Sequence, residues 1–444
     1  MRILHVPYTY FPDPCGGTEV YVRGLARELA RDGYFSAVAA PATVAANYVF
    51  DSVDVHRFAI DPKPRRDYAH GAPDAVAAAG FKRIVADVRP DIVHLHARTS
   101  AVSENLVGIA HAAGARVVFT YHTPTVSCAR GTMLLFGIAQ SDGVQEAYRC
   151  AACVLSKHGV PTAVARVIAR LPRGLSGSVA VLGEYCRPFA AFAVPENVRL
   201  GHSRFQELTQ GADAIVVIST WVGEVLQRNN VPEAKVALVR QGIVQHIEPQ
   251  FPRSKDRTVA PLRLAYFGRI DRAKGLDIVI QALQSNPAAA VRLAIFGVNQ
   301  DAGNSEFDRV LALAGVDGRI EVHAAVAAER VQEEMSRLDL IVVPSRGLEN
   351  APLVVLEAFA AGVPVLGANL GGIAELVRDG IDGVLVAADD VGAWAEAIAG
   401  LSADRERIEK LRQGVRPPRT MRAVAAEMAV IYERLLTSVP RANA

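Results

Sequence analysis

Residues 262–283 read LRLAYFGRIDRAKGLDIVIQAL. A short apolar run, a polar turn and a second apolar stretch with helical spacing predict a buried strand, a loop and a helix. Arg269 follows the strand, and Lys274 stands at the entry to the helix. A helix dipole disfavours a lysine at that end, so an anion in front of the two cations would explain the pair, and a diphosphate fits both charges. The alternative is that both side chains are simply solvated in a surface turn.

The same alternation of short apolar runs and longer helix-patterned segments extends through nearly all 444 residues. Strands that are apolar on both faces and separated by helices predict parallel sheets covered by helices on each side. The expected strands lie at residues 3–6, 37–40, 92–96, 117–121 and 215–218, and then at 262–267, 291–296, 320–323, 340–344, 363–365 and 383–386. Each group predicts a doubly wound α/β domain that binds its ligands at the carboxyl ends of the strands.

A polar stretch punctuated by prolines, residues 248–256, separates the two groups of strands and is typical of a linker. We therefore expect an N-terminal domain over residues 1–248 and a C-terminal domain over residues 258–416. Beyond Pro418 a helical pattern resumes. The helix expected at about 419–438 must bury its apolar stripe against one of the domains.

Charge and hydropathy exclude several classes of protein. Lys and Arg total 48 and Asp and Glu total 46, a net charge of +2, which argues against a protein that neutralises the phosphates of a nucleic acid. No apolar run approaches the roughly 18 residues of a membrane-spanning helix, so we expect a cytoplasmic protein. Residues 160–173 combine Arg166, Arg170 and Arg173 with an apolar side. This pattern indicates either peripheral contact with the inner face of the cytoplasmic membrane or an ordinary solvated helix.

A second turn between a strand and a helix carries two consecutive glycines. The strand at residues 3–6 leads through Gly16 and Gly17 into a helix with an apolar face. Glycines let the backbone approach a ligand closely, and a helix N-terminus offers free N–H groups to a phosphate. The spacing is not that of a dinucleotide-binding fingerprint, and such a turn is also a routine connection. The turn is therefore either a site of phosphate or sugar contact or an ordinary connection between a strand and a helix.

Two glutamates follow the strand at residues 340–344. Glu349 lies in the loop, and Glu357 falls in an otherwise apolar helix. A carboxylate in apolar surroundings is costly unless it accepts hydrogen bonds. The vicinal hydroxyls of a ribose or a hexose would supply them, and backbone amides are the alternative partners.

Together these motifs resemble those of the retaining GT-B glycosyltransferases of family 4. The resemblance is strongest over residues 262–387 and includes the glycine turn, the basic pair, the spaced glutamates and the segments 371–375 and 379–386. It implies two Rossmann-like domains that face a cleft. It further implies that the C-terminal domain holds the nucleotide sugar and that the final helix packs back on the N-terminal domain.

The resemblance also implies a role for each motif residue. Arg269 and Lys274 would hold the diphosphate of the donor, where stabilisation of the leaving group lowers the barrier most. Glu357 would hold the ribose hydroxyls, and Glu349 would hold hydroxyls of the donor sugar. The remaining donor contacts would come from the backbone near Asn350 and Leu353 and, in the other domain, from Gly16 and Gly17.

His122 follows the strand at residues 117–121, where the family carries a histidine that faces the transferred sugar. It would hydrogen-bond the sugar or shuttle a proton. Retention in the family is attributed to front-face attack, in which the leaving diphosphate accepts the proton of the acceptor. We therefore expect neither a protein nucleophile nor a catalytic metal. For His94 and His96, at the end of a neighbouring strand, we expect buried structural roles, with acceptor contact as the alternative for His96.

Two segments depart from the family pattern. Residues 240–244 read RQGIV, where members often have Asn-Gly followed by an acidic residue. Residues 323–326 read HAAV in place of the more usual aromatic-Leu-Gly run near the strand that binds the base. The nucleotide base is therefore left open between uracil and guanine.

The cysteines add a hypothesis of a structural zinc site. Cys150 and Cys153 form a pair with two residues between them, and Cys128 lies upstream, so three thiolate ligands are available. The fourth ligand would be His158 or Cys186, and the alternative is a set of reduced, partly buried thiols. These residues fall in an insertion at about 127–194, which we expect on the acceptor side of the site.

The sequence thus predicts a hexosyltransferase that uses a nucleoside-diphosphate sugar and acts on a glycolipid or a polysaccharide precursor. A GT-B nucleotide-sugar epimerase or a phosphorylase is one alternative. A nucleotide-sugar-binding module without turnover is the other.

Overall fold

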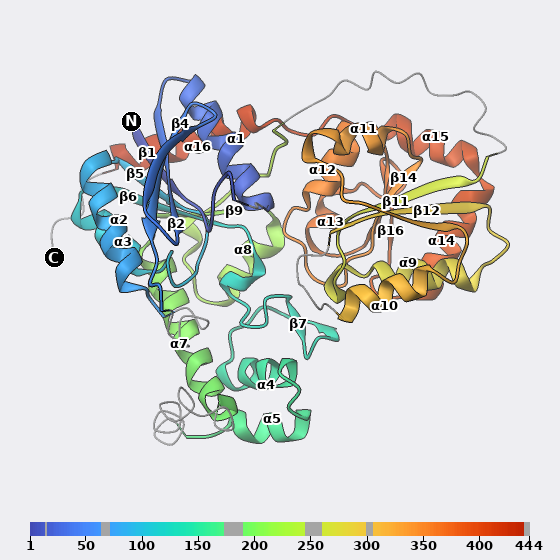
Figure 1. The fold of residues 1–444 in the computed structure, drawn as a ribbon, viewed down its shortest axis with the longest axis horizontal. Helices are drawn as coiled ribbons and strands as arrows, with labels where there is room; N and C mark the ends of the chain where they lie inside the picture. Colours follow the sequence, from blue (N-terminus) through green and yellow to red (C-terminus); the bar gives the residue numbers. More distant parts are fainter. Residues whose placement is uncertain (14–15, 64–71, 173–189, 245–259, 299–304, 439–444) are drawn as a thin grey trace. The chain divides into compact units, whose positions relative to one another are not determined.

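A computed structural model describes the chain except for residues 14–15, 64–71, 173–189, 245–259, 299–304 and 439–444. The chain divides into two compact units (Figure 1). Unit 1 comprises residues 1–244 together with 421–444, and unit 2 comprises residues 245–420. Each unit contains one large sheet, and the two are described in turn.

The sheet of unit 1 has eight strands in the order β10-β9-β6-β5-β1-β2-β4-β3. Its strands pair in parallel except for β3, which pairs antiparallel with β4 at the edge. The central strands are buried along their length, as expected of strands covered on both faces. The bounds are Arg2–Val6 for β1, Phe35–Ala42 for β2, Ala46–Phe50 for β3, Val53–Ala59 for β4, Ile92–Leu95 for β5, Arg116–Tyr121 for β6, Ala214–Val217 for β9 and Val236–Leu238 for β10.

Five helices accompany this sheet, and the last comes from the end of the chain. They are α1 (Gly17–Arg31), α2 (Ala75–Val88), α3 (Asn105–Ala112), α8 (Thr220–Arg228) and α16 (Met421–Thr437). Helix α16 lies beside α1 (Figure 1). Its side chains Met421, Val424, Met428 and Tyr432 share one core with Tyr21, Val22 and Leu25 of α1. The apolar stripe of the final helix is therefore buried within unit 1.

A smaller helical layer with a core of its own interrupts unit 1 after β6. It begins with a 3-10 turn, η2 (Pro124–Val126), and a short hairpin of β7 (Leu134–Leu135) and β8 (Ala139–Gln140). Helices α4 (Ala147–Lys157), α5 (Thr162–Ala169) and α7 (Ala190–Gly211) follow. Their buried alanines, valines and Leu155 form a separate apolar cluster, so this layer is more than a loop.

Unit 2 has six parallel strands in the order β13-β12-β11-β14-β15-β16. The chain starts at β11, adds β12 and β13 on one side, and then adds β14 to β16 on the other. Ligands of such sheets bind at the carboxyl ends where the order reverses, which here is between β11 and β14. The strands are β11 (Leu262–Arg269), β12 (Val291–Val298), β13 (Ile320–His323), β14 (Leu340–Val343), β15 (Val365–Ala368) and β16 (Gly383–Val386).

The helices of unit 2 enclose a single apolar core. They are α9 (Leu276–Ser285), α10 (Ser305–Ala314), α11 (Val331–Ser336), α12 (Leu353–Ala360), α13 (Gly371–Leu376), α14 (Val391–Ala403) and α15 (Arg405–Gly414), and a 3-10 turn, η5 (Arg272–Lys274), precedes α9. Trp394 of α14 is the largest side chain wholly buried here, and its indole N–H donates to the carbonyl of Ala387.

The predicted α/β class and doubly wound sheets are confirmed, and every predicted strand has its counterpart. In the large sheet of unit 1, the sequence prediction missed β3, β4 and β10, which are short or alternate polar with apolar residues because they lie toward the sheet edges. It also missed the two-residue strands β7 and β8 of the separate hairpin. Among the described residues, no helix has the length and hydropathy needed to cross a membrane.

Candidate active site

The turn after β11 is shaped by one glycine that no other residue can replace without strain. Gly275 has a φ of 69°, and a Cβ built there would lie 2.1 Å from the carbonyl oxygen of Pro344, directly after β14. Such a contact is far inside van der Waals distance, so only glycine lets the two loops meet. The Asp271 side chain accepts from the backbone N–H of Lys274 at 3.2 Å and caps η5. This turn and the end of β14 therefore touch through backbone atoms.

That contact brings two of the predicted site residues together. Lys274 Nζ donates to Glu349 Oε1 at 2.7 Å, and Ser345 Oγ donates to the same oxygen at 2.9 Å. Burial alone would raise the pKa of Glu349, but the charge and hydrogen bond of Lys274 outweigh it and hold the pKa below its usual value. Glu349 is therefore an anion at the point where the strand order reverses.

Arg269 contributes a second positive charge at the same edge. It ends β11, its side chain is 54% exposed, and its Nη2 lies 3.3 Å from Asp271 Oδ2. Its charge also lowers the pKa of Glu349, although less than Lys274 does. The structure thus brings Arg269, Lys274 and Glu349 together, as the sequence predicts.

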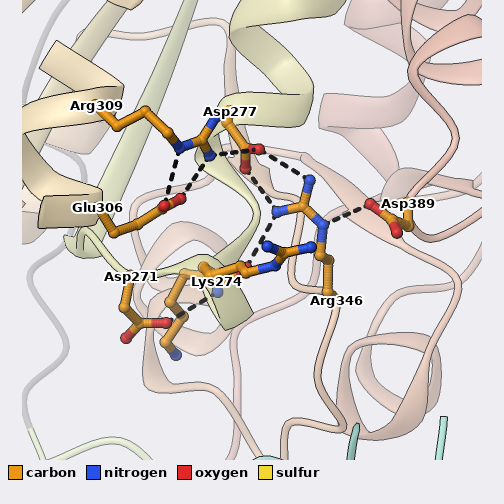
Figure 2. A network of polar contacts seen from close by, with 8 residues as sticks. Asp271, Lys274, Asp277, Glu306, Arg309, Arg346 and Asp389 are labelled. Atoms are coloured by element: carbon orange, nitrogen blue, oxygen red, sulfur yellow. Dashed lines mark hydrogen bonds and ion pairs between the residues drawn. The ribbon is translucent and has the colours of Figure 1, made fainter. Parts of the chain in front are cut away.

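A third element of the site is an ion-pair network that ties the loop after β14 to α9. Arg346 donates to both carboxylate oxygens of Asp277 at 2.6 and 3.0 Å, and Figure 2 shows Asp277 between Arg346 and Arg309. Arg346 also bonds Asp389 and the carbonyl of Arg272. Burial pushes the pKa of Asp277 upward, but the hydrogen bonds from the two arginines hold it below its ordinary value. This network holds the loop that carries Glu349.

The backbone after Glu349 is fixed by a close approach to α13. The N–H of Gly372 donates to the carbonyl of Glu349 at 2.8 Å, and a Cβ at position 372 would lie 1.9 Å from the carbonyl oxygen of Asn350. Asn350 is buried, and Leu353 is the first residue of α12. Their predicted proximity to the phosphates remains a prediction.

Glu357 lies in the second turn of α12 and is half-buried. Burial raises the pKa of its carboxyl group to about 7. The group is thus close to half-ionised at neutral pH, and a partner that donates hydrogen bonds would stabilise its anionic form.

Three aromatic rings form a row across the carboxyl ends of β11, β12 and β13. Phe267 stacks on Phe296 with ring centroids 4.5 Å apart, and Phe296 stacks on His323 at 4.9 Å. Register places the three side by side. The family's usual motif is absent at residues 323–326, yet His323 itself supplies a ring to this row.

The predicted residues of unit 1 lie at the carboxyl ends of β1 and β6. Gly16 and Gly17 are exposed at the N-terminus of α1, where Glu19 Oε2 accepts from the N–H of Gly16 at 2.9 Å. His122 directly follows β6 and packs edge-on against Tyr21, with ring centroids 4.8 Å apart. The glycine turn and His122 belong to a different unit from Arg269, Lys274 and Glu349.

His122 is the end member of a buried group of four histidines. His96 Nδ1 lies 3.1 Å from His122 Nε2, and His96 Nε2 lies 3.2 Å from His5 Nδ1. His94 bonds the hydroxyls of Tyr432 and Thr120, each at 2.6 Å. Burial lowers the pKa of His122 and of His5 to about 3, so both imidazoles are neutral at physiological pH. His94 and His96 are buried and bonded to other side chains, and the structural roles expected for them remain a prediction.

The zinc prediction is not supported. Cys128, Cys150 and Cys153 are free thiols, and in the described parts of the chain they do not form a group of three ligand atoms within 4.8 Å. Burial, with smaller effects from the other two cysteines, raises the pKa of Cys150 to about 11, so the thiol form is favoured. Cys153 Sγ accepts from the N–H of Phe136 at 3.1 Å. The cysteines are close in sequence, but the described structure does not bring three ligand atoms together at them. Cys186 lies outside the described residues.

Sequence reasoning missed Asp277, Ser345, Arg346 and His5, and it did not foresee the contacts that link His5 to His96 and His96 to His122. Ser345 and Arg346 precede Glu349 in the same loop, but their partners are distant in sequence. Arg346 pairs with a residue 69 positions away, and His5 with one 91 positions away. The sequence did carry one signal for these residues, because each of them follows a strand or lies close to its carboxyl end.

Comparisons with known proteins agree with this geometry. Residues 15–156 match the family model described as Glycosyltransferase Family 4, and residues 261–404 match the model described as Glycosyl transferases group 1. The two matches together cover more than half of the chain. The chain belongs to the family 4 glycosyltransferases.

Curated relatives share part of their length with this family 4 glycosyltransferase. A D-inositol 3-phosphate glycosyltransferase of Nocardia farcinica is 34% identical over 155 residues, which is 33% of this chain and 34% of the relative. One from Mycobacterium sp. (strain KMS) is 30% identical over 238 residues, 51% of this chain and 50% of the relative. The matches thus span between a third and a half of these relatives.

Solved structures establish the GT-B fold for this family member. HepE from Anabaena, in complex with UDP and glucose, superposes with a TM-score of 0.65 at 16% identity, covering 99% of this chain and 100% of that one. A sucrose-phosphate synthase from Thermosynechococcus elongatus superposes with a TM-score of 0.67 at 19% identity and the same coverage. The predicted fold is confirmed.

Proposed function

We propose that this chain is a retaining hexosyltransferase that moves a sugar from a nucleoside-diphosphate donor to a hydroxyl of a glycolipid or a polysaccharide precursor. The observation that carries the proposal is the contact of Lys274 with Glu349 and Ser345, beside Arg269, at the switch point of the sheet of unit 2. Cations there suit an anionic leaving group, and an ionised carboxylate there suits sugar hydroxyls.

The two cations act on the leaving diphosphate. Negative charge develops on the departing phosphate as the sugar becomes oxocarbenium-like, so positive groups held in place stabilise the transition state more than the ground state. An ammonium has three N–H donors, so Lys274 can keep its bond to Glu349 and still reach a phosphate oxygen. Arg269 adds planar donors beside it.

The acceptor loses its proton to the leaving diphosphate oxygen in this proposal. The acceptor oxygen forms the new bond to the anomeric carbon on the face from which the phosphate departs, so the configuration is retained and no protein nucleophile is needed. His122, neutral because its pKa is about 3, would hydrogen-bond the transferred sugar rather than act as an imidazolium acid. Gly16 and Gly17 would approach the diphosphate through their backbone, with Gly17 as the N–H donor because the N–H of Gly16 donates to Glu19 Oε2.

Helix α5 supports an acceptor carried by a membrane surface. Val164 and Val167 are 49% and 68% exposed, Arg166 is on the same helix, and Arg170 is the residue that caps its C-terminus. Exposed apolar side chains beside arginines are typical of helices that lie at an anionic lipid interface. We propose this helix as the site of peripheral membrane contact.

The replacement Lys274→Ala tests the proposal, with Arg272→Ala as a matched control in the same 3-10 turn. We expect Lys274→Ala to lower kcat/KM by about 100-fold or more, because the loss of one transition-state donor typically costs that much. Arg272→Ala should leave turnover within a factor of about three. Donors are first chosen by thermal shift against a panel of nucleotide sugars, because binding to the native state raises the melting temperature.

Product analysis separates the proposed activity from its alternatives. Transfer of the sugar to an added acceptor with retained configuration supports it. An isomerised nucleotide sugar would show an epimerase, and a sugar 1-phosphate would show a phosphorylase. Binding without turnover, or equal turnover by the Lys274→Ala variant, would contradict it.

A further inference from the structure

A second candidate binding site lies wholly within unit 1. A cavity of about 460 Å³ opens beyond the carboxyl ends of β1, β5 and β6, between those strand ends and the helices α4 and α7. Its size is that of a pocket for one small ligand. None of the residues predicted above to hold the donor lines this cavity.

The lining of the cavity is basic and contains no carboxylate. Its basic side chains are Arg98, Arg130, Lys157 and His202, and the neutral polar ones include Thr99, Ser100, Thr125, Ser127, Gln145 and Asn197. One part of the wall is apolar and consists of Val126, Val154, Val194 and Val198. A concave surface with cations, hydroxyls and amides but no acidic group is suited to an anion that also carries hydroxyls.

Arg98 is the central charge of this surface. Its Nη1 donates to the carbonyl of Val126 at 3.1 Å and its Nη2 to that of Gly201 at 2.6 Å, while its Nε is buried without a hydrogen-bond partner among the described residues. Burial lowers the pKa of Arg98, and Glu104, the carboxylate that most offsets this effect, pairs with Arg204 at 3.8 Å. Neutral carbonyls thus hold a half-buried guanidinium that makes no ion pair within 4.0 Å among the described residues, although Glu104 and Glu207 act on it at longer range. An anion in the cavity would give this guanidinium a direct partner.

The other basic groups are held in place around the same space. Arg130 donates to the carbonyl of Cys153 at 3.1 Å, and Lys157 donates to the carbonyl of Arg130 at 3.3 Å. His202 has a buried Nε2 without a partner among the described residues, and burial, helped by Arg98, lowers its pKa to about 4. A neutral imidazole with Nε2 protonated is a hydrogen-bond donor that needs no counter-ion.

We infer that this cavity binds the phosphate of a phosphorylated acceptor, with Arg98, Arg130, Lys157 and His202 as its donors. The inference rests on the proposed function, because the cavity lies at the carboxyl edge of the sheet that also carries His122. Guanidinium groups match the tetrahedral oxygens of a phosphate, and the hydroxyl and amide groups match a polyol or sugar attached to it. The phosphate belongs either to a free sugar or polyol phosphate or to a lipid phosphate.

Binding measurements on the full chain with paired probes test the inference. Calorimetry compares D-inositol 3-phosphate with inositol, and vesicle co-sedimentation compares phosphatidylcholine vesicles with and without a polyprenyl phosphate. We expect the phosphorylated member of one pair to bind and its neutral counterpart to bind at least about tenfold more weakly, as charge-assisted bonds require. Binding in the first pair identifies a soluble acceptor, and binding in the second identifies a lipid.

Replacements of the basic side chains of the cavity test whether the phosphorylated probe binds there. Lys157 is exposed, so the replacement Lys157→Gln should not disturb folding. The double variant with Lys157→Gln and Arg130→Gln should weaken binding of the phosphorylated probe by about tenfold or more. Arg149→Gln, on the same helix α4 but paired with Asp142, is the control and should leave binding unchanged. The inference would be overturned if phosphorylated and neutral probes bound equally well. It would also be overturned if the double variant with Lys157→Gln and Arg130→Gln bound the phosphorylated probe as tightly as the parent chain does.

Measurements of nucleotide-sugar binding distinguish a failure of this inference from a failure of the proposed function. The cavity variants should retain the affinity of the parent chain for the nucleotide sugar, whereas Lys274→Ala should retain the affinity for the phosphorylated probe. If the protein binds and transfers the donor sugar but does not bind the phosphorylated probe, only this inference is wrong. If the protein binds no nucleotide sugar, the proposed function is wrong.

Discussion

The half-buried carboxyl group of Glu357 should make both stability and nucleotide binding depend on pH. Burial raises its pKa from 4.5 to about 7, so the folded protein holds a proton there that the unfolded chain releases near pH 4.5. Below about pH 4.5 the group is protonated in both states and does not affect stability. As the pH rises from about 4.5 to 7, the folded state becomes progressively less stable relative to the unfolded chain, and above pH 7 the full penalty remains. Ribose hydroxyls would offset this cost, because a diol donates to the carboxylate and stabilises its ionised form.

Nucleotide affinity should therefore depend on the ionisation of Glu357. From pH 6 to pH 8 we expect the affinity for a nucleoside diphosphate to rise by up to about tenfold, because the ionised fraction rises by that factor around a pKa near 7. Glu357→Gln should remove this part of the pH dependence, and calorimetry at each pH measures it. Glu406→Gln, an exposed position paired with Lys410, is the control. Identical pH dependence in the parent chain and in Glu357→Gln would contradict the assignment.

At the scale of elements, the site depends on how the loop between β14 and α12 is held. Arg346 links this loop to Asp277 of α9, to Asp389 and to the backbone of Arg272 (Figure 2). The backbone N–H groups of Arg346 and Gly347 both donate to the carbonyl of Ala273, at 2.8 and 3.2 Å. Two loops far apart in sequence thus form one rigid support for Lys274 and Glu349.

Removing the charge of Asp277 should loosen that support. Asp277→Asn leaves the half-buried Arg346 without its principal partner, so we expect the free energy of unfolding to fall by about 2–4 kcal/mol. We also expect the KM for the donor to rise more than kcat falls, because positioning rather than chemistry is impaired. Arg292→Ala, which breaks an exposed ion pair with Glu321, should cost less than about 1 kcal/mol. Denaturant unfolding and donor kinetics measure both, and equal effects of the two variants would refute the role of the network.

At the scale of the whole molecule, the end of the chain completes the core of unit 1. Helix α16 brings Tyr432 to His94, 338 residues earlier in the chain, and Tyr432 is fully buried beside the histidine group. His5, His94, His96 and His122 are all kept neutral by burial, which lowers each pKa well below 6.5. The unfolded chain binds protons at these positions near pH 6.5, but the folded unit does not.

This protein should therefore lose stability in mild acid. Each such histidine contributes stability that is present above about pH 6.5 and is lost as the pH falls below it, at up to about 1.4 kcal/mol per pH unit. We expect the free energy of unfolding to fall steeply between pH 6.5 and 4.5. His5→Asn should reduce that slope by about 1.4 kcal/mol per pH unit, which is the effect of one proton. His56→Asn, at a half-buried position outside this histidine group, should leave the slope unchanged. A slope equal in the parent chain and in His5→Asn, by denaturant unfolding at several pH values, would refute this account.

Much of the site could be predicted because its residues follow strands. Arg269, Lys274, Glu349 and His122 all lie within a few residues of the carboxyl end of a strand, and in a parallel sheet those ends share one edge. Cysteine spacing was a poorer guide, because zinc needs sulfurs aimed at one point and spacing along a helix does not determine where they point. The cavity of unit 1 was not predictable, since its basic residues come from four separate segments.

The sequence alone determined the α/β class and the two groups of parallel strands, because apolar runs and turns are local patterns that report burial directly. Only the tertiary structure decided which groups meet: Lys274 with Glu349, Arg346 with Asp277, Tyr432 with His94, and Arg98 with the carbonyls of Val126 and Gly201. Those pairings depend on strand order and helix packing, which place residues tens to hundreds of positions apart within hydrogen-bond distance.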